Sequence, residues 1–298
     1  MARTNFEELL DAGVHFGHLR RKWNPNMAPY IFMERNGIHI IDLYKTMAKL
    51  EEAASALKQI AKSGRKVLFV ATKKQAKEIL ATQVQKVGMP YVVERWPGGM
   101  LTNFATIRKA VRKMGSIDKL MSTSNFKSLS KRERLQINRE RQKLEKQLGS
   151  IAELNRLPSA IFVVDILKEK IAVAEARKLN IPTFAIVDTN SDPNIIDFPI
   201  PGNDDASKSI ELIVRVLVQA IEEGLAERKI DKEARGDEDE RDEFDQAILS
   251  VDVLDDEEDA DAIRKKALEK LGKVKKEGED RMDDAGKRPR RSLSKTRK

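Results

Sequence analysis

Residues 13–32 hold the densest group of side chains in the sequence that could do chemistry. Arg20, Arg21 and Lys22 are consecutive cations, and Trp23 and Asn24 follow them directly. Cations neutralise phosphate groups, and an aromatic ring stacks on an unpaired base. The stretch therefore predicts contact with a nucleic acid. The alternative is a solvated basic loop that buries one tryptophan.

Two histidines of the same stretch, His15 and His18, raise the question of a metal site, because imidazoles are common metal ligands. The chain has no cysteine and only three histidines, and the arginines that follow would repel a cation. We therefore expect no catalytic metal here, and we count both histidines among the candidate nucleic-acid contacts.

Carboxylates form a second candidate group later in the chain. Asp188, Asp192, Asp204 and Asp205 could bind Mg²⁺ through their oxygens. The Asp, Asn and Pro residues around them are equally typical of turns. The sequence leaves open whether this group holds a structural divalent ion.

Short apolar runs and amphipathic helices alternate around these groups. Residues 66–71, 91–94, 161–164 and 183–187 are typical of buried parallel strands, whereas residues 42–62, 75–87, 169–178 and 206–223 have helical spacing. This order predicts an α/β fold, in which helices cover both faces of a parallel sheet.

Ligands of such sheets bind where the strands end. Lys73 and Lys74 follow the first run, and Arg95 and Trp96 follow the second, so cations again stand beside an aromatic ring. A packed tryptophan with solvated lysines would give the same pattern. The sequence lacks the GxGxxG and GxxxxGKS/T motifs, and no nucleophile can be paired with a base. An α/β enzyme for nucleotides or sugar phosphates remains the alternative function, without a motif, catalytic residue or cofactor to support it.

Local turn and cap signals complete the first part of the chain. Asn36-Gly37 between the apolar runs 30–35 and 38–41 predicts a β-hairpin, because both turn residues need positive φ. Arg35 and Asn36 would then be available at its tip. Thr4 and Glu7 have the spacing of a helix capping box.

Residues 102–157 interrupt the α/β alternation. Two thin apolar stripes at helical spacing, separated near residues 122–125, predict an antiparallel helical hairpin. Ser130 and Glu133 have the spacing of a capping box for its second helix. The polar side is rich in cations, which could meet RNA or simply be solvated. A helical scaffold that binds only protein is a second rival function.

Two long motifs carry a family resemblance. FEELLDAGVHFG at residues 6–17, with its continuation RRKWNPNMAPYIFMERNGIHIIDLYKT, resembles the family of bacterial small-subunit ribosomal protein two. PSAIFVVDILKEKIAVAEARKLNIP at residues 158–182 is a second, independent match. The resemblance extends from about residue 5 to residue 224.

The resemblance implies a flavodoxin-like α/β domain formed by residues 1–101 and 158–224, with residues 102–157 as an inserted coiled coil. It implies a non-enzymatic constituent of the small ribosomal subunit, a ribonucleoprotein that serves translation. The implied partners are 16S ribosomal RNA and neighbouring proteins, including the large OB-repeat protein that captures messenger RNA. No cofactor, small-molecule substrate or membrane contact is expected. The residues and the resemblance together predict rRNA-binding by His15, His18, Arg20, Arg21, Lys22, Trp23, Asn24, Arg35, Asn36, Lys73, Lys74, Arg95, Trp96, Asn103, Arg108, Lys109, Arg112, Lys113 and Arg132.

Charge is distributed unevenly along the 298 residues, whose net charge is +8. Residues 1–150 contain 29 Lys and Arg against 13 Asp and Glu, whereas residues 151–224 contain 7 against 12. One side of the fold should therefore face a polyanion. No apolar run reaches the roughly 20 residues that span a bilayer, and no signal-peptide core is present, so we expect a cytoplasmic protein.

Residues 225–298 have a different composition. Residues 231–261 contain 3 basic against 16 acidic residues, and residues 262–298 contain 15 against 6. Such segments bury too little apolar surface to fold alone, which predicts a disordered tail. The resemblance stops before it. The two charge blocks could attract each other until a polyanion displaces the acidic one, or the tail could have no role.

Overall fold

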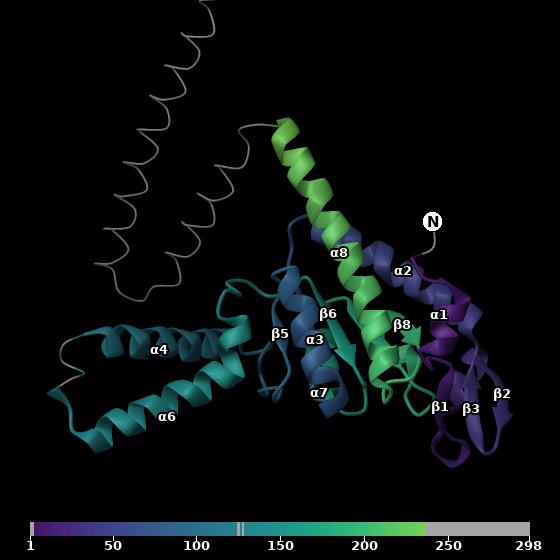
Figure 1. Cartoon of the computed structure of the whole chain (residues 1–298), viewed down its shortest axis with the longest axis horizontal. Coiled ribbons are helices and arrows are strands. Elements are labelled where there is room, and N and C mark those ends of the chain that lie inside the picture. The colour runs from purple at the N-terminus through teal and green to yellow at the C-terminus, as the bar shows by residue number, and fades with distance from the viewer. Residues whose placement is uncertain (1–2, 124–125, 127, 236–298) are drawn as a thin grey trace, which may run out of the picture. The chain divides into compact units, whose positions relative to one another are not determined.

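The computed structural model describes residues 3–123, 126 and 128–235 (Figure 1). The chain divides into two units, Met1–Ile230 and Asp231–Lys298. Residues 225–235 of the tail predicted to be disordered are helical and end α8 (Ser207–Arg235), whereas the predictions for the rest of the tail lie outside the described residues. Within the described part, no helix is long and apolar enough to cross a membrane.

A five-stranded sheet forms the centre of the first unit. In spatial order its strands are β5 (Tyr91–Val92), β4 (Val67–Val70), β6 (Ala160–Val164), β7 (Thr183–Val187) and β8 (Phe198–Pro201). Every neighbouring pair is parallel, so the predicted α/β fold with a parallel sheet is confirmed. The sequence did not predict β8, because Pro199 and Pro201 are typical of turns. Proline is tolerated in an edge strand, where its missing N–H costs no ladder bond.

Two apolar cores lie on the two faces of this sheet. Phe69, Phe162 and Phe184 belong to the first core, whereas their strand neighbours Leu68 and Ile161 belong to the second. Helices α2 (Leu43–Lys62), α3 (Lys74–Lys86) and α8 (Ser207–Arg235) cover the first core, and α7 (Lys170–Lys178) covers the second (Figure 1). Strands buried on both faces explain the wholly apolar runs in the sequence.

A second, three-stranded sheet lies near the N-terminus, after α1 (Phe6–Asp11). It is antiparallel, in the order β1 (Phe16–Leu19), β3 (Ile38–Ile41) and β2 (Ile31–Arg35). Asn36 and Gly37 have φ of 54° and 75°, so the predicted hairpin turn is confirmed. The predicted cap of α1 is wrong: the N-cap is Asn5, and its side chain makes no capping hydrogen bond.

The described residues of the insertion form helices α4 (Phe104–Ser122) and α6 (Lys131–Leu148), and the short turn η3 (Gly149–Ile151) follows α6. The predicted capping box of Ser130 and Glu133 is present. Ion pairs of Lys113 with Glu140 and of Arg141 with Asp118 join the helices. The base of the insertion packs in the second core, through Leu148, Ile151 and Leu154 among others. The coiled coil and the boundaries at residues 102 and 157 stay predictions.

Candidate nucleic-acid interface

The basic loop, residues 20–24, connects β1 to the turn η2 (Pro25–Tyr30) through the turn η1 (Arg20–Lys22). The Arg20 N–H donates to the Gly37 carbonyl at 2.9 Å, and the Asn24 N–H donates to the Thr189 carbonyl at 2.7 Å. The Asn24 side chain caps η2 by accepting from the Asn26 N–H at 2.9 Å. The backbone of the basic loop is therefore fixed at both ends.

The side chains of the basic loop face solvent. The Arg20 side chain is 71% exposed and its Nη1 lies 3.4 Å from Glu34 Oε2; Arg21 and Lys22 are exposed as well. Trp23 is 38% exposed, and its ring packs obliquely on buried His39 with centroids 5.2 Å apart. A shallow hollow of about 700 Å³ is lined by Leu19, Arg20, Arg21, Trp23 and Gly37. Cations around an accessible indole suit phosphates beside an unpaired base.

Lys73, which follows β4, is surrounded by carboxylates, whereas the cations of the basic loop face solvent. Its Nζ is 2.9 Å from Asp204 Oδ1, 2.6 Å from Asp205 Oδ1 and 3.5 Å from Asp165 Oδ2, and the side chain is 12% exposed. Burial alone would lower the pKa of Lys73, but the hydrogen bonds to Asp204 and Asp205 outweigh it and the pKa is raised. Lys73 therefore neutralises carboxylates of its own chain. Its neighbour Lys74, the first residue of α3, is exposed.

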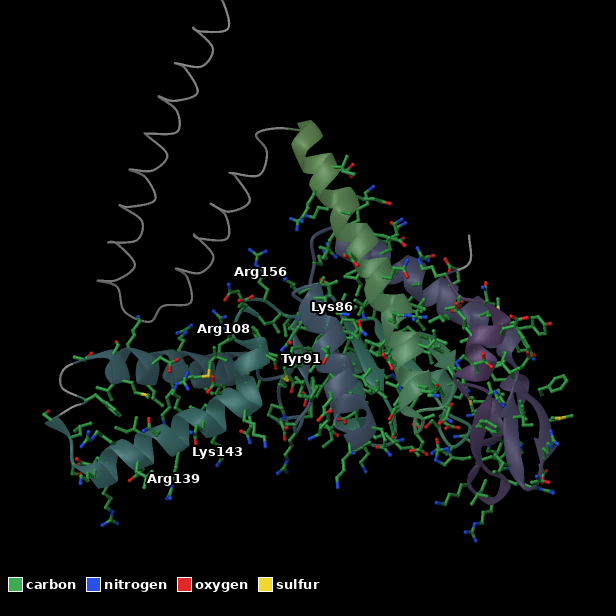
Figure 2. The ribbon with its side chains drawn as sticks, in the orientation of Figure 1. Lys86, Tyr91, Arg108, Arg139, Lys143 and Arg156 are labelled. Atoms are coloured by element: carbon green, nitrogen blue, oxygen red, sulfur yellow. The ribbon has the colours of Figure 1, made fainter. Side chains whose placement is uncertain are left out.

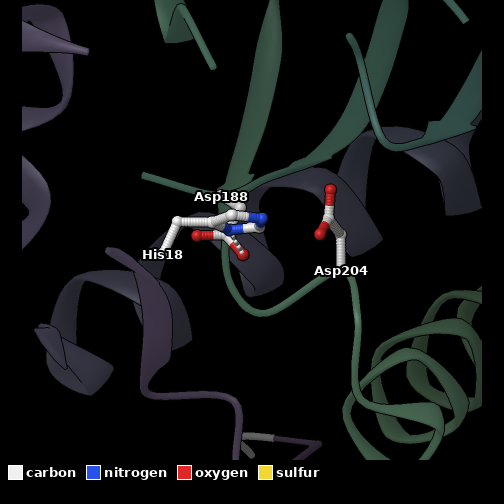
Figure 3. Close-up of side chains that lie close together, drawn as sticks. All are labelled: His18, Asp188 and Asp204. Atoms are coloured by element: carbon white, nitrogen blue, oxygen red, sulfur yellow. Dashed lines mark ion pairs between the residues drawn. The ribbon is translucent and has the colours of Figure 1, made fainter. Parts of the chain in front are cut away.

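His18, Asp188 and Asp204 converge (Figure 3), and Asp204 pairs with Lys73. His18 Nδ1 is 2.9 Å from Asp188 Oδ2, and the Asp188 carboxylate raises the pKa of His18. Asp188 Oδ2, apart from this ion pair, and Asp204 Oδ2 are buried without a hydrogen-bond partner. Burial and the neighbouring Asp188 raise the pKa of Asp204 to about 7.

These three side chains could hold a divalent cation. One ligand atom from each of His18, Asp188 and Asp204 lies within 4.8 Å of the others. An imidazole with carboxylates suits zinc and other divalent ions. The Lys73 ammonium already offsets part of the negative charge, through Asp204 and Asp205.

Asp192, which the sequence grouped with the carboxylates, and His15, which it paired with His18, make other contacts. The Asp192 side chain caps the turn η4 (Pro193–Ile195) by accepting from the Asn194 N–H at 3.0 Å. His15 packs on Phe16 with ring centroids 4.0 Å apart, and burial lowers its pKa. Of the four carboxylates grouped by sequence, Asp188, Asp204 and Asp205 therefore come together around His18 and Lys73.

Arg95 and Trp96, which lie in the segment that follows β5, differ from each other in the same way. Trp96 is 7% exposed, and its Nε1–H donates to Glu175 at 3.1 Å. A ring held like this cannot stack on a base. Arg95 beside it is exposed, as are Arg35 and Asn36 at the tip of the β2–β3 hairpin. Arg95 is therefore a candidate for nucleic-acid contact, like the exposed residues of the basic loop, whereas Trp96 stabilises the fold.

The cations of the insertion also fall into two groups. Arg108 Nη1 donates to the Leu154 carbonyl at 3.0 Å, and burial followed by the charge of Arg112 lowers its pKa. The Lys113 side chain is 60% exposed, but its Nζ pairs with Glu140 Oε1 of α6. Other exposed residues of the insertion include Asn103, Lys109, Arg112 and Arg132, together with Arg139 and Lys143 on the side of α6 that faces away from α4 (Figure 2).

Sequence reasoning missed two features of the structure: the buried acceptor Glu175 and a group of exposed apolar side chains. Glu175 accepts hydrogen bonds from the loop around Trp96, and its signal was a lone acid inside the apolar run IAVAEA of α7. Phe16, Phe32 and Met33 are exposed on the three-stranded sheet, and the Phe32 side chain is 69% exposed. Their signal was a strand with apolar residues on successive positions, which places some of them on the outer face.

Comparisons with known proteins cover most of the chain. Residues 9–224 match the protein family described as ribosomal protein S2. The small ribosomal subunit protein uS2 of Phocaeicola vulgatus is 69% identical over 240 residues, which cover 80% of this chain and 86% of that protein. Its namesake in Bacteroides thetaiotaomicron is 68% identical over 240 residues, with the same coverage of 80% and 86%. That of Porphyromonas gingivalis is 68% identical over 232 residues, covering 78% and 83%. The family match includes the basic loop, the strand-end cluster and the insertion.

Proposed function

The chain belongs to the ribosomal protein S2 family, and we propose that it is a structural constituent of the small ribosomal subunit that binds 16S ribosomal RNA and helps dock neighbouring proteins. As a member of a structural family the chain is not an enzyme, which removes the α/β nucleotide or sugar-phosphate enzyme as an alternative. A bacterial ribosomal protein works in the cytoplasm, in agreement with the location predicted from the sequence.

The basic loop is the observation that carries the RNA-binding part of this proposal. Its backbone is held by Gly37 and Thr189, so the three cations project from a fixed base. Trp23 stands beside them with its ring accessible. Phosphate contacts give affinity and register, and stacking on an exposed ring adds a contact to a base.

The outward cations of the insertion form a second part of the proposed interface. Lys109 and Arg112 lie three residues apart on α4, and both are exposed. Side chains at this spacing share one face of a helix. Long basic helices of this kind follow RNA backbones through shape and phosphate contacts. We leave Lys73 and Trp96 out of the interface because both are buried by contacts within the chain.

For protein docking we propose the exposed apolar side chains of the three-stranded sheet, which are Phe16 on β1 and Phe32 and Met33 on β2. Exposed aromatic and methionine side chains are enriched at the centres of protein interfaces. The occupant that we propose is the OB-repeat protein that captures messenger RNA. Changing Phe32 to Ser should reduce the amount of that protein on purified small subunits and leave binding to 16S RNA unchanged. An unchanged amount of the OB-repeat protein on the small subunits would remove these apolar side chains from the proposal.

Sedimentation tests the proposed function directly. A tagged chain expressed in bacteria should travel with small ribosomal subunits in a sucrose gradient of cell lysate, at low and moderate salt. Purified protein should bind 16S RNA with an affinity that falls as salt rises. A chain that stays at the top of the gradient and shows no binding to 16S RNA would contradict the proposal.

A shortened insertion tests the contribution of α4 and α6. Replacing residues 112–141 with a short Gly/Ser linker keeps Leu148, Ile151 and Leu154 in the second core. The shortened protein should keep its cooperative melting transition and bind 16S RNA more weakly. Equal binding would show that the insertion serves another partner, and loss of the transition would show that its outer part supports the core.

A further inference from the structure

One buried carboxylate holds the loop from which the insertion begins. Glu175 lies on α7 and accepts hydrogen bonds through both oxygens from the loop 96–102. Oε1 accepts from the Trp96 Nε1–H at 3.1 Å and the Gly99 N–H at 2.8 Å. Oε2 accepts from the Leu101 N–H at 2.9 Å, the Thr102 N–H at 3.2 Å and the Thr102 hydroxyl at 3.3 Å.

The charge of Glu175 strengthens these hydrogen bonds. Burial acts to raise its pKa, but the donors of Trp96 and of the loop backbone outweigh burial, so the pKa is lowered. Glu175 is therefore ionised at neutral pH, with the loop dipoles around it. Hydrogen bonds to an ionised acceptor are roughly twice as strong as those between neutral groups.

Glu175 holds the backbone that leads into α4, a helix without a side-chain cap at its N-terminus. The N-cap Asn103 makes no side-chain capping bond to the helix backbone. Glu175 satisfies the N–H groups of Leu101 and Thr102 just before it. The other end of the insertion is held separately, since Leu148 and Ile151 are buried in the second core. The carboxylate therefore fixes one of the two chain segments that join the insertion to the α/β core.

We propose that Glu175 is a positioning residue for RNA binding, which fixes the loop 96–102 and so sets where α4 presents Lys109 and Arg112. This inference rests on the proposed function of the exposed cations. It makes a prediction opposite to that of simple electrostatics. Removing a negative charge from an RNA-binding protein should strengthen binding, whereas loss of positioning should weaken it.

The variant Glu175→Gln tests which of these two effects determines the RNA affinity. Glutamine keeps the shape, but its NH₂ group replaces one of the two carboxylate oxygens and cannot accept from the donors that this oxygen served. We expect the affinity for 16S RNA to fall about tenfold, and the plot of log affinity against log salt to flatten by about 0.7–0.9, one phosphate contact. Glu211→Gln on the exposed side of α8 is the charge-matched control, and it should bind as tightly as the unchanged protein or slightly more tightly.

Two further variants separate positioning from loss of stability. Val218→Ala removes apolar contact from the first core, away from the insertion; it should lower the melting temperature and leave the salt slope unchanged. Changing Lys109 and Arg112 to Ala should cost less affinity in the Glu175→Gln background than in the unchanged protein, because mispositioned cations contribute less. Equal costs in both backgrounds, with an unchanged slope for Glu175→Gln, would overturn the inference.

The outcomes also distinguish this inference from the proposed function. If the unchanged protein neither binds 16S RNA nor sediments with small subunits, the proposed function fails. If the unchanged protein binds and Glu175→Gln binds equally well, only the role of Glu175 fails. Should Glu175→Gln not fold, Trp96→Phe and Thr102→Val each remove one side-chain donor. Their combination should then flatten the salt slope in a folded protein, and an unchanged slope would overturn the inference.

Discussion

The basic loop and the strand-end pair Lys73 and Trp96 contain the same kinds of side chain, yet the fold uses them in opposite ways. In the basic loop, Arg20 is mostly exposed and Trp23 keeps an accessible ring. At the strand ends, Lys73 is paired with Asp204 and Asp205, and Trp96 donates to Glu175. A cation beside an aromatic ring is therefore not by itself a nucleic-acid site.

Buried acceptors make the difference between the two regions. A cation or an indole N–H that enters the core needs an acceptor there, because an unsatisfied polar group in the core costs about 1–3 kcal/mol. The acceptors near the strand ends are Asp204 and, on α7, Glu175, whereas Arg20 of the basic loop pairs with the partly exposed Glu34. Substitutions at the strand ends should thus change stability, and substitutions in the basic loop should change RNA binding.

Lys73→Ala should give the largest effect on folding. It leaves the carboxylates of Asp204 and Asp205 without their ammonium partner, and breaking a buried pair costs about 3–5 kcal/mol. Because Asp205 is partly exposed, we expect a loss of about 3 kcal/mol in the free energy of unfolding, measured in urea. Lys74→Ala, one residue on and exposed, is the control and should change it by less than about 0.5 kcal/mol. A Lys73→Ala protein that is stable but has lost RNA binding would contradict the claim that Lys73 stabilises the fold and does not contact RNA.

The two tryptophans sharpen the comparison at a smaller scale. Trp96→Leu removes a buried ring and a hydrogen bond to Glu175, so stability should fall by about 2 kcal/mol. Trp23→Leu should leave the melting temperature nearly unchanged and reduce the affinity for 16S RNA by about 1–2 kcal/mol, the value of one stacked base. Fluorescence of the remaining tryptophan reports on folding in each variant. If Trp23→Leu lowers the stability and Trp96→Leu lowers the RNA affinity instead, the roles given to the two rings are reversed.

Lys113→Gln should give the smallest effect. Lys113 pairs with Glu140 between α4 and α6 at an exposed site, where such pairs contribute about 0.2–1 kcal/mol. RNA affinity should change less than in Arg112→Gln, its exposed neighbour, because the Lys113 charge already has a partner. Equal losses in the two variants would mean that RNA displaces Glu140 from Lys113.

Local patterns in the sequence predicted much of the fold. The strands at residues 66–71 and 183–187, the turn at Asn36 and Gly37 and the cap at Ser130 depend on neighbouring residues, and the structure contains each of them. The edge strand β8 was missed because its prolines resemble a turn. The orientation of the strand-end side chains could not be predicted from neighbouring residues, because their partners are distant in the sequence. Asp204 lies 131 residues from Lys73, and Glu175 lies 79 residues from Trp96.

The salt dependence of 16S RNA binding tests the central claim, that the outward cations of the basic loop meet phosphate, most directly. Arg20, Arg21 and Lys22 are changed together to Ala, with folding checked by thermal melting. The affinity for 16S RNA is then measured over a series of salt concentrations for this variant and the unchanged protein. We predict an unchanged melt, a lower affinity, and a slope of log affinity against log salt that is flatter by roughly 2–3 phosphate contacts, at about 0.9 per contact on duplex RNA or DNA and about 0.7 on single strands. An unchanged slope in a folded variant would contradict the claim.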